Sequence, residues 1–177
     1  DEMAAINSKG VLQIHSVGEP LLWENLIQAV RYSKINKVQT WIFTSAITCD
    51  TSLLEELCKN IDIIEISVNS IEREDYLQTK GIDEFELVKS NILYMLEYIK
   101  NNHLSTRLIC SRVQTNDKRQ DDNFVSYWKN IDGISDVFVR SFHNYNGLLN
   151  SNHDKQCMNN QACLVQWARF NIDVNGD

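Results

Sequence analysis

Residues 11 to 22 read VLQIHSVGEPLL, and this stretch joins a predicted strand to a predicted helix. An apolar run that favours β structure meets Gly18, Glu19 and Pro20 and gives way at once to a helical pattern. Gly18 permits a positive φ or the close approach of a ligand, and Pro20 suits a first helical position. A carboxylate between a strand and a helix lies where α/β proteins gather ligand-binding groups. The alternative is that Glu19 only starts a helix, near the positive end of its dipole.

Strand and helix patterns alternate through the rest of the chain. After the strand at residues 11–17, we expect strands at 37–45, 62–70, 105–113 and 135–144, and helices at 20–35, 51–61, 84–102 and 121–131. Residues 71–82 are read as a connection. The helix at 84–102 presents one apolar side, and the helix at 20–35 is expected to do the same through Leu22, Leu26, Ile27 and Val30. This order predicts an α/β protein with a parallel sheet and right-handed crossovers, an open or partial barrel.

Composition and charge narrow the class of protein. The 177 residues are 43% hydrophobic and carry a net charge of −7, with scattered Lys and Arg, which argues against nucleic acid as the main partner. The sequence has no apolar run long enough for a membrane span and no signal peptide, so we expect a cytoplasmic protein without a membrane partner. Five cysteines, an odd number, argue against a disulfide framework. Cys58 and Cys110 are expected to be buried apolar residues, whereas Cys157 and Cys163 lie in a polar segment.

Polar residues gather where the predicted strands end. In a parallel sheet these ends meet at one edge, and a carboxylate, hydroxyls, amides and guanidiniums there suit a ligand with an amine, sugar hydroxyls and a carboxylate. A plainer alternative stays open for each: Ser67 and Asn69 only terminate a strand, and Arg112 and Arg140 form ion pairs with Asp117 or Glu65. The residues at the strand ends are Gly18 and Glu19, Thr44 and Ser45, Ser67 and Asn69, Ser111 and Arg112, and Arg140 with His143 and Asn144.

Four stretches resemble the radical S-adenosylmethionine superfamily. HSVGEPLL (residues 15–22) is similar to its Gly-Gly-Glu-Pro motif, with Val17 in place of the first glycine. TSAITCD (44–50) stands where many members have Thr-Asn-Gly, so Ser45 and Ala46 replace Asn-Gly. IEISVNS (64–70) resembles the fourth strand, and EFELVKSNILYML (84–96) matches the helix that often follows. The resemblance implies a partial (β/α)6 TIM-like barrel with parallel strands that lacks the first strand.

The same resemblance implies a site for S-adenosylmethionine. Glu19 and the backbone around Gly18 would receive the methionine ammonium, since an acceptor-only carboxylate matches that group. Ser67 and Asn69 would contact ribose or carboxylate oxygens, and Arg112 would make a forked contact to the methionine carboxylate. The expected cofactor-binding residues are Gly18, Glu19, Pro20, Thr44, Ser67, Asn69 and Arg112.

Iron–sulfur ligands are implied at two places. The superfamily holds its [4Fe–4S] cluster with a Cys-x-x-x-Cys-x-x-Cys loop upstream of the Gly-Glu-Pro strand, and this sequence contains no such triplet. We therefore expect a fragment that does not assemble that cluster by itself. Cys163 and the following LVQWARFNIDVNGD (164–177) resemble the start of a SPASM or twitch module, where thiolates hold an auxiliary cluster. Cys157 is a further candidate ligand, and VNGD is itself a hairpin signal. The expected domains are residues 1–150, the partial barrel, and 151–177, the start of the module.

Three functions follow from these patterns. The leading one is an enzyme that cleaves S-adenosylmethionine reductively to a 5′-deoxyadenosyl radical, which abstracts hydrogen in peptide or protein modification or in dehydrogenation. Flavodoxin or ferredoxin would donate the electron. The second is a non-catalytic barrel that binds S-adenosylmethionine or a nucleotide, and the third is a cofactor-free lyase or isomerase with His15 or His143 as the base.

Overall fold

Residues 10–15 and 18–141 of the 177-residue chain are described by a computed structural model. They form one five-stranded sheet in which the strands lie in sequence order and every neighbouring pair is parallel. The strands are β1 (Val11–Ile14), β2 (Gln39–Thr44), β3 (Ile63–Ser67), β4 (Arg107–Val113) and β5 (Ile134–Arg140). The helices are the 3-10 helix η1 (Pro20–Leu22), α2 (Leu26–Ile35), α3 (Thr51–Asn60), α4 (Arg73–Lys80), α5 (Phe85–Asn101) and α6 (Lys118–Lys129).

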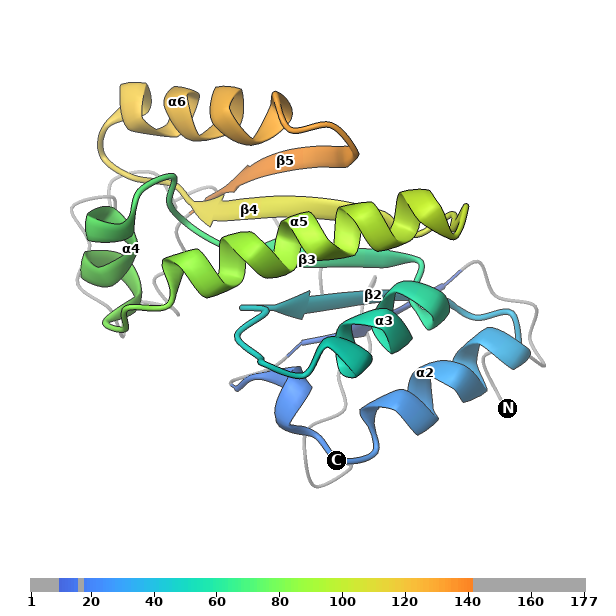
Figure 1. The fold of residues 1–177 in the computed structure, drawn as a ribbon. Helices are drawn as coiled ribbons and strands as arrows, with labels where there is room; N and C mark the ends of the chain where they lie inside the picture. The colour runs from blue at the N-terminus through green and yellow to red at the C-terminus, as the bar shows by residue number, and fades with distance from the viewer. Residues whose placement is uncertain (1–9, 16–17, 142–177) are drawn as a thin grey trace, which may run out of the picture. The chain divides into compact units, whose positions relative to one another are not determined.

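The predicted α/β class and the parallel order of the strands are confirmed. Helices α2, α3 and α5 lie side by side over one face of the sheet, as Figure 1 shows. This arrangement is consistent with a partial β/α barrel. The chain divides into two compact units, residues 1–141 and 142–177, and all described residues belong to the first. The expected C-terminal hairpin module and the boundary at residue 150 lie outside the described residues.

The hydrophobic core fills the space between the sheet and its helices. Successive side chains of a strand point to opposite faces, and the face toward the helices carries a row of buried residues at matching register, Ile42, Ile64 and Leu108. The predicted apolar side of α5 packs against this face, from Phe85 to Leu96. Cys58 and Cys110 are buried in the same core, as expected. Periodicity therefore located most of the core correctly.

Two helix predictions were wrong. The single helix expected at residues 20–35 is divided into η1 and α2, and Leu22, placed on its buried side, is 82% exposed. The division follows from Glu19. Its side chain accepts hydrogen bonds from the Leu21 N–H in η1 and from the Ser45 N–H at the end of β2, so η1 cannot pack on the core as α2 does. The connection at 71–82 contains α4, which has only one buried residue, Tyr76, and so lacks an apolar stripe. None of the described helices is both long and apolar enough to cross a membrane.

Candidate binding site at the strand ends

The carboxyl ends of the strands form the edge that we call the mouth, defined by Glu19, Thr44, Ser45, Ser67, Asn69 and Lys80. Helices η1 and α4 both lie at this end of the sheet, beside the arrowheads of the strands (Figure 1). Parallel strands bring these groups to one edge because every strand of the sheet ends there. The mouth therefore has the position at which α/β proteins bind ligands.

Glu19 is the central group of the mouth. Its Oε1 accepts hydrogen bonds from the Leu21 backbone N–H at 3.2 Å and from the Thr44 hydroxyl at 2.5 Å. Its Oε2 accepts from the backbone N–H of Ser45 at 2.8 Å and from the Ser45 hydroxyl at 2.5 Å. Glu19 also caps η1, with Pro20 as the first residue of that turn. Glu19 is therefore a helix cap, as the plainer interpretation expects, and its carboxylate is at the same time held at the end of β2.

The loop after β2 holds the donors that orient Glu19. Ala46, which stands at the glycine position of the Thr-Asn-Gly pattern, has φ +56°, a conformation that costs an alanine about 1 kcal/mol. Its N–H donates to the Thr44 hydroxyl at 2.9 Å. The buried side chain of Asn91, on α5, donates to the carbonyls of Ala46 and Thr48, both at 2.9 Å. Asn91 was not singled out from the sequence, where it is one polar residue among the apolar ones of a helix.

Asn91→Ala is expected to lower the free energy of unfolding by about 1 to 3 kcal/mol, because it leaves two loop carbonyls without their donor. Denaturation in urea measures this change, and the exposed neighbouring substitution Ser90→Ala is the control. Equal effects of the two substitutions would show that Asn91 does not hold the loop.

Gly18, ahead of Glu19, is exposed and has φ +153°, a conformation that L side chains rarely adopt.

At the end of β3, the Asn69 side chain fastens β3 to β4. Its Oδ1 accepts from the Val113 backbone N–H at 2.8 Å, and its Nδ2 lies 3.4 Å from the Ser67 hydroxyl. The backbone of Asn69 has φ +60° and donates to the Ser111 carbonyl. These contacts favour the plainer interpretation for Asn69, a residue that terminates a strand. They leave the Ser67 hydroxyl facing the mouth, where it meets Lys80.

Lys80 of α4, which was not selected from the sequence, also reaches the mouth. The Lys80 Nζ lies 3.2 Å from the Ser67 hydroxyl. Burial lowers the pKa of Lys80, and the negative charge of Glu19 opposes that shift. The Tyr76 hydroxyl is buried and has no hydrogen-bond partner among the described residues. Burial raises the pKa of Tyr76, and the charges of Glu84 and Glu19 raise it further, so this hydroxyl also lies within the field of Glu19.

Arg112 is turned away from the mouth and toward α6. It is 3% exposed, its Nε lies 3.3 Å from an Asp121 oxygen, and its guanidinium carbon lies 5.2 Å from the centre of the Phe124 ring. One terminal nitrogen also donates to the Gln120 carbonyl at 3.3 Å. This geometry favours the ion-pair interpretation of Arg112. The expected partner was wrong, because Asp117 instead caps α6 through the Arg119 N–H.

Arg140 forms the ion pair with Glu65 that the sequence analysis left open, and this pair is confirmed. Glu65 is 1% exposed on β3, and its carboxylate meets the Arg140 guanidinium in two hydrogen bonds. The guanidinium also lies 5.1 to 5.8 Å from the centres of three aromatic rings, those of Trp41, Phe43 and Phe138. His15 contacts the same aromatic group through Phe43. These residues cover the face of the sheet opposite the hydrophobic core.

The described residues do not fit an iron–sulfur cluster. No group of three His, Cys, Asp or Glu side chains in residues 10–15 and 18–141 could hold a metal ion. Burial raises the pKa of Cys58 to about 12 and also raises that of Cys110, so neither thiol is poised to become a thiolate ligand. The expected ligands Cys157 and Cys163, together with His143 and Asn144, lie outside the described residues.

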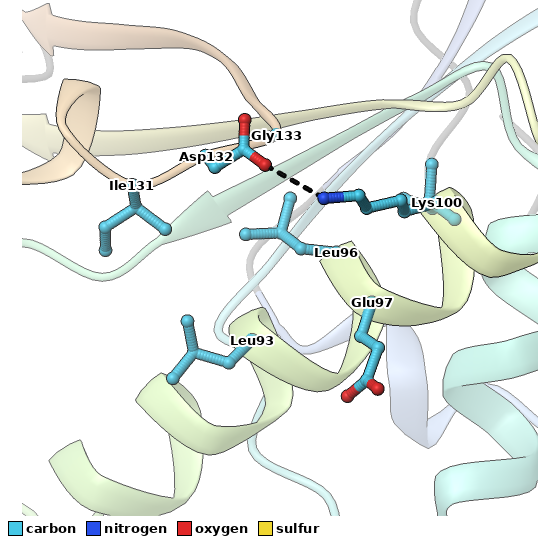
Figure 2. A pocket seen from close by; sticks show the side chains of 8 residues that line it. Leu93, Leu96, Glu97, Lys100, Ile131, Asp132 and Gly133 are labelled. Atoms are coloured by element: carbon cyan, nitrogen blue, oxygen red, sulfur yellow. Dashed lines mark hydrogen bonds and ion pairs between the residues drawn. The ribbon is translucent and has the colours of Figure 1, made fainter.

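An open and mostly apolar pocket lies away from these groups. Figure 2 shows Leu93 and Leu96 of α5 facing Ile131 and Gly133, with an ion pair between Lys100 and Asp132 above them. The pocket is formed where α5 ends and β5 begins, which is the edge opposite the mouth. It contains none of the residues predicted to bind a ligand.

Comparison with solved structures identifies the fold. No protein-family model and no curated protein matches the chain. SuiB from Streptococcus suis bound to the precursor peptide SuiA has a TM-score of 0.67 and 19% identity, over 84% of this chain and 32% of SuiB. SuiB bound to S-adenosylmethionine gives 0.63 and 18%, over 80% and 32%. A domain of the pyruvate-formate lyase-activating enzyme from Bacteroides vulgatus gives 0.60 and 13%, over 77% and 83%.

At 13 to 19% identity, these neighbours show that the chain shares their fold. The chain spans about a third of the length of the SuiB chains that it matches.

Proposed function

We propose that this chain is the main part of the barrel of a radical S-adenosylmethionine enzyme and that it binds S-adenosylmethionine at the mouth. The observation that supports this most strongly is the carboxylate of Glu19, fastened by Thr44 and Ser45 at the edge where the parallel strands end. The fold is shared with a protein whose structure includes S-adenosylmethionine. A rigid carboxylate that only accepts hydrogen bonds suits the methionine ammonium.

In this proposal the residues of the mouth bind and orient the amino-acid part of the cofactor. Glu19 already accepts four hydrogen bonds, two of them from the hydroxyls of Thr44 and Ser45. A hydroxyl rotates freely, whereas the backbone donors are fixed, so the incoming ammonium replaces a hydroxyl. The exchange is favourable because a hydrogen bond between two charged groups is stronger than one from a neutral hydroxyl. The backbone N–H groups then keep Glu19 aimed at the ligand.

S-adenosylmethionine, when cleaved reductively, supplies a 5′-deoxyadenosyl radical that abstracts hydrogen from a substrate. The described residues contain no ligands for the cluster that delivers the electron, so this part of the proposal depends on a cysteine loop outside them. We further propose an auxiliary cluster at Cys163 with Cys157, and flavodoxin or ferredoxin as the electron donor. A peptide or protein substrate is proposed because SuiB, which shares the fold, is seen bound to a precursor peptide.

Glu19→Gln in the full-length protein tests the proposal. The substitution keeps the shape of the side chain and removes the charge, so we expect S-adenosylmethionine to bind roughly ten- to hundredfold more weakly. Anaerobic titration measures the affinity. Glu24→Gln, five positions along the chain and exposed, is the matched control and should bind as the parent does.

An unchanged affinity of the Glu19→Gln variant would contradict the proposed site. Binding without any formation of 5′-deoxyadenosine, in protein reconstituted with iron and sulfide, would favour the non-catalytic binding barrel instead.

A further inference from the structure

The face of the sheet opposite the hydrophobic core carries a buried ion pair that packing alone does not require. Glu65, in the middle of β3, is 1% exposed, and its two oxygens accept hydrogen bonds from the Nε and Nη2 of Arg140 at 2.7 and 2.5 Å. Because a buried carboxylate is costly to desolvate, an apolar pair of similar volume is often as stable as such an ion pair. The pair is therefore weak evidence for a purely structural role of Arg140.

The guanidinium of Arg140 has donors that Glu65 does not use. The two hydrogen bonds to Glu65 occupy the Nε–H and one N–H of Nη2. The remaining N–H groups, on Nη1 and Nη2, have no hydrogen-bond partner among the described residues. The Arg140 side chain is 44% exposed, so a ligand can reach them. Together Nη1 and Nη2 form an edge of parallel donors that matches the two oxygens of a carboxylate.

A second donor on the same face is without an acceptor. The indole N–H of Trp41, on β2, is buried and has no hydrogen-bond partner among the described residues. The Trp41 ring stacks on Phe43 with the ring centres 5.2 Å apart, and its centre lies 5.8 Å from the guanidinium carbon of Arg140. A buried N–H ordinarily has an acceptor, so this one marks a place for a ligand that supplies acceptors.

The surroundings of Arg140 favour a charged ligand at the edge of the sheet that also contains the mouth. Arg140 is the last residue of β5, and all the strands are parallel, so its backbone lies at the edge where the mouth lies. The ring centres of Phe43 and Phe138 lie 5.5 and 5.1 Å from its guanidinium carbon. These rings exclude water from one side and so strengthen a hydrogen bond between charged groups.

We propose that Arg140 and Trp41 together bind a carboxylate of the substrate, so that the enzyme acts on an acidic peptide or protein segment. This inference rests on the proposed function and adds the substrate class to it. Both groups are donors, and an ionised carboxylate only accepts. Glu65 orients the guanidinium and is a positioning residue. The partial exposure of Arg140 keeps the incoming carboxylate in contact with water, which screens its repulsion from Glu65.

Three peptides test the proposal by calorimetry with the full-length protein, kept anaerobic and saturated with S-adenosylmethionine. The probes are acetyl-Gly-Gly-Glu-Gly-Gly-amide, the same peptide with Gln in place of Glu, and acetyl-pentaglycine with a C-terminal carboxylate. We expect a carboxylate probe to bind roughly tenfold more tightly than the Gln peptide. The tighter of the two carboxylate probes shows whether an acidic side chain or a chain end is the source.

Two variants keep the positive charge that Glu65 needs. Trp41→Phe removes the indole N–H and keeps an aromatic ring, and Arg140→Lys keeps the charge and loses the planar fork. Each should lower the preference for the carboxylate roughly tenfold and leave the affinity for S-adenosylmethionine unchanged. Arg107→Lys is the matched control, because Arg107 is exposed on the same face of the sheet at the other end of β4, and it should keep the parent's preference.

Circular dichroism establishes that each variant is folded, and if Arg140→Lys does not fold, Trp41→Phe decides alone. Folded variants with the parent's full preference, or a parent that does not distinguish the Glu peptide and the free carboxylate from the Gln peptide, would overturn the assignment. The proposed function stands in that case if the parent binds S-adenosylmethionine. A parent that does not bind S-adenosylmethionine would overturn both.

Discussion

Asp121→Ala is expected to lower the free energy of unfolding by about 3 to 5 kcal/mol, because it leaves the buried guanidinium of Arg112 without its counter-charge. Arg112 is 3% exposed and Asp121 is 7% exposed, so water cannot replace the lost partner. The substitution also removes the acceptor for the N–H and hydroxyl of Thr115, which lie 2.9 to 3.2 Å from the Asp121 carboxylate. Urea denaturation followed by circular dichroism measures the loss.

The neighbouring substitution Asp122→Ala is the matched control, since Asp122 is exposed one position further along α6. It should change the stability by less than about 0.5 kcal/mol. The double substitution Arg112→Leu with Asp121→Leu should recover part of the loss, because it removes both charges together. If Asp121→Ala were as mild as its control, the ion pair would not matter to the fold, and Arg112 would again be open to a ligand.

Trp128→Ala should lower the free energy of unfolding by a similar amount, about 3 to 5 kcal/mol, since the whole ring is buried and its removal leaves a cavity. The indole N–H also donates to the Ser70 carbonyl at 3.0 Å. Ser70 follows Asn69 and fixes the start of α4, so this bond connects α6 to the segment that positions Lys80. Denaturation in urea measures the loss of stability, with Trp23→Ala, a half-exposed tryptophan, as the control.

Trp128→Phe separates the ring from its hydrogen bond. This variant keeps most of the packing and should lose about 1 to 3 kcal/mol, the cost of an unsatisfied buried carbonyl. We also expect the folded variant to bind S-adenosylmethionine more weakly than the folded parent does, because the start of α4 loses the hydrogen bond from Trp128 to the Ser70 carbonyl. A Phe variant as unstable as the Ala variant would show that the hydrogen bond, rather than the ring, carries the energy.

The sequence predicted the sheet well because each strand carries its own signal. Short runs rich in Ile, Val and Phe, separated by amphipathic helices, permit one arrangement of parallel strands with right-handed crossovers. Helix α5 was placed almost to the residue, since its apolar side recurs at helical spacing over 17 residues. Helix α4 was missed because only one of its eight residues, Tyr76, is buried, and a single buried residue gives no such period.

The site was predicted in part, and the difference is instructive. Glu19 and Thr44 were both selected because they follow strands, and the structure brings them together. Arg112 was selected by the same rule, although Leu108 and Cys110, four and two positions earlier, are core residues of the helix-facing side. Alternation along a strand places Arg112 on that same side, so this signal was available in the sequence. Lys80 had no comparable signal, since its helix was not predicted.

By itself, the sequence determined the order of the elements, the direction of the strands and the position of the Gly-Glu-Pro turn at their ends, because these depend on periods and turn residues that are local. Only the tertiary structure decided which side chains meet: Arg112 lies against Asp121, Arg140 pairs with Glu65 among the partners that the sequence left open, and Lys80 lies against the neutral Ser67 hydroxyl. These partners are separated by 9, 75 and 13 positions in the chain. The choice among many candidate partners depends on strand register and helix packing, which bring distant residues within hydrogen-bonding distance only after the core has formed.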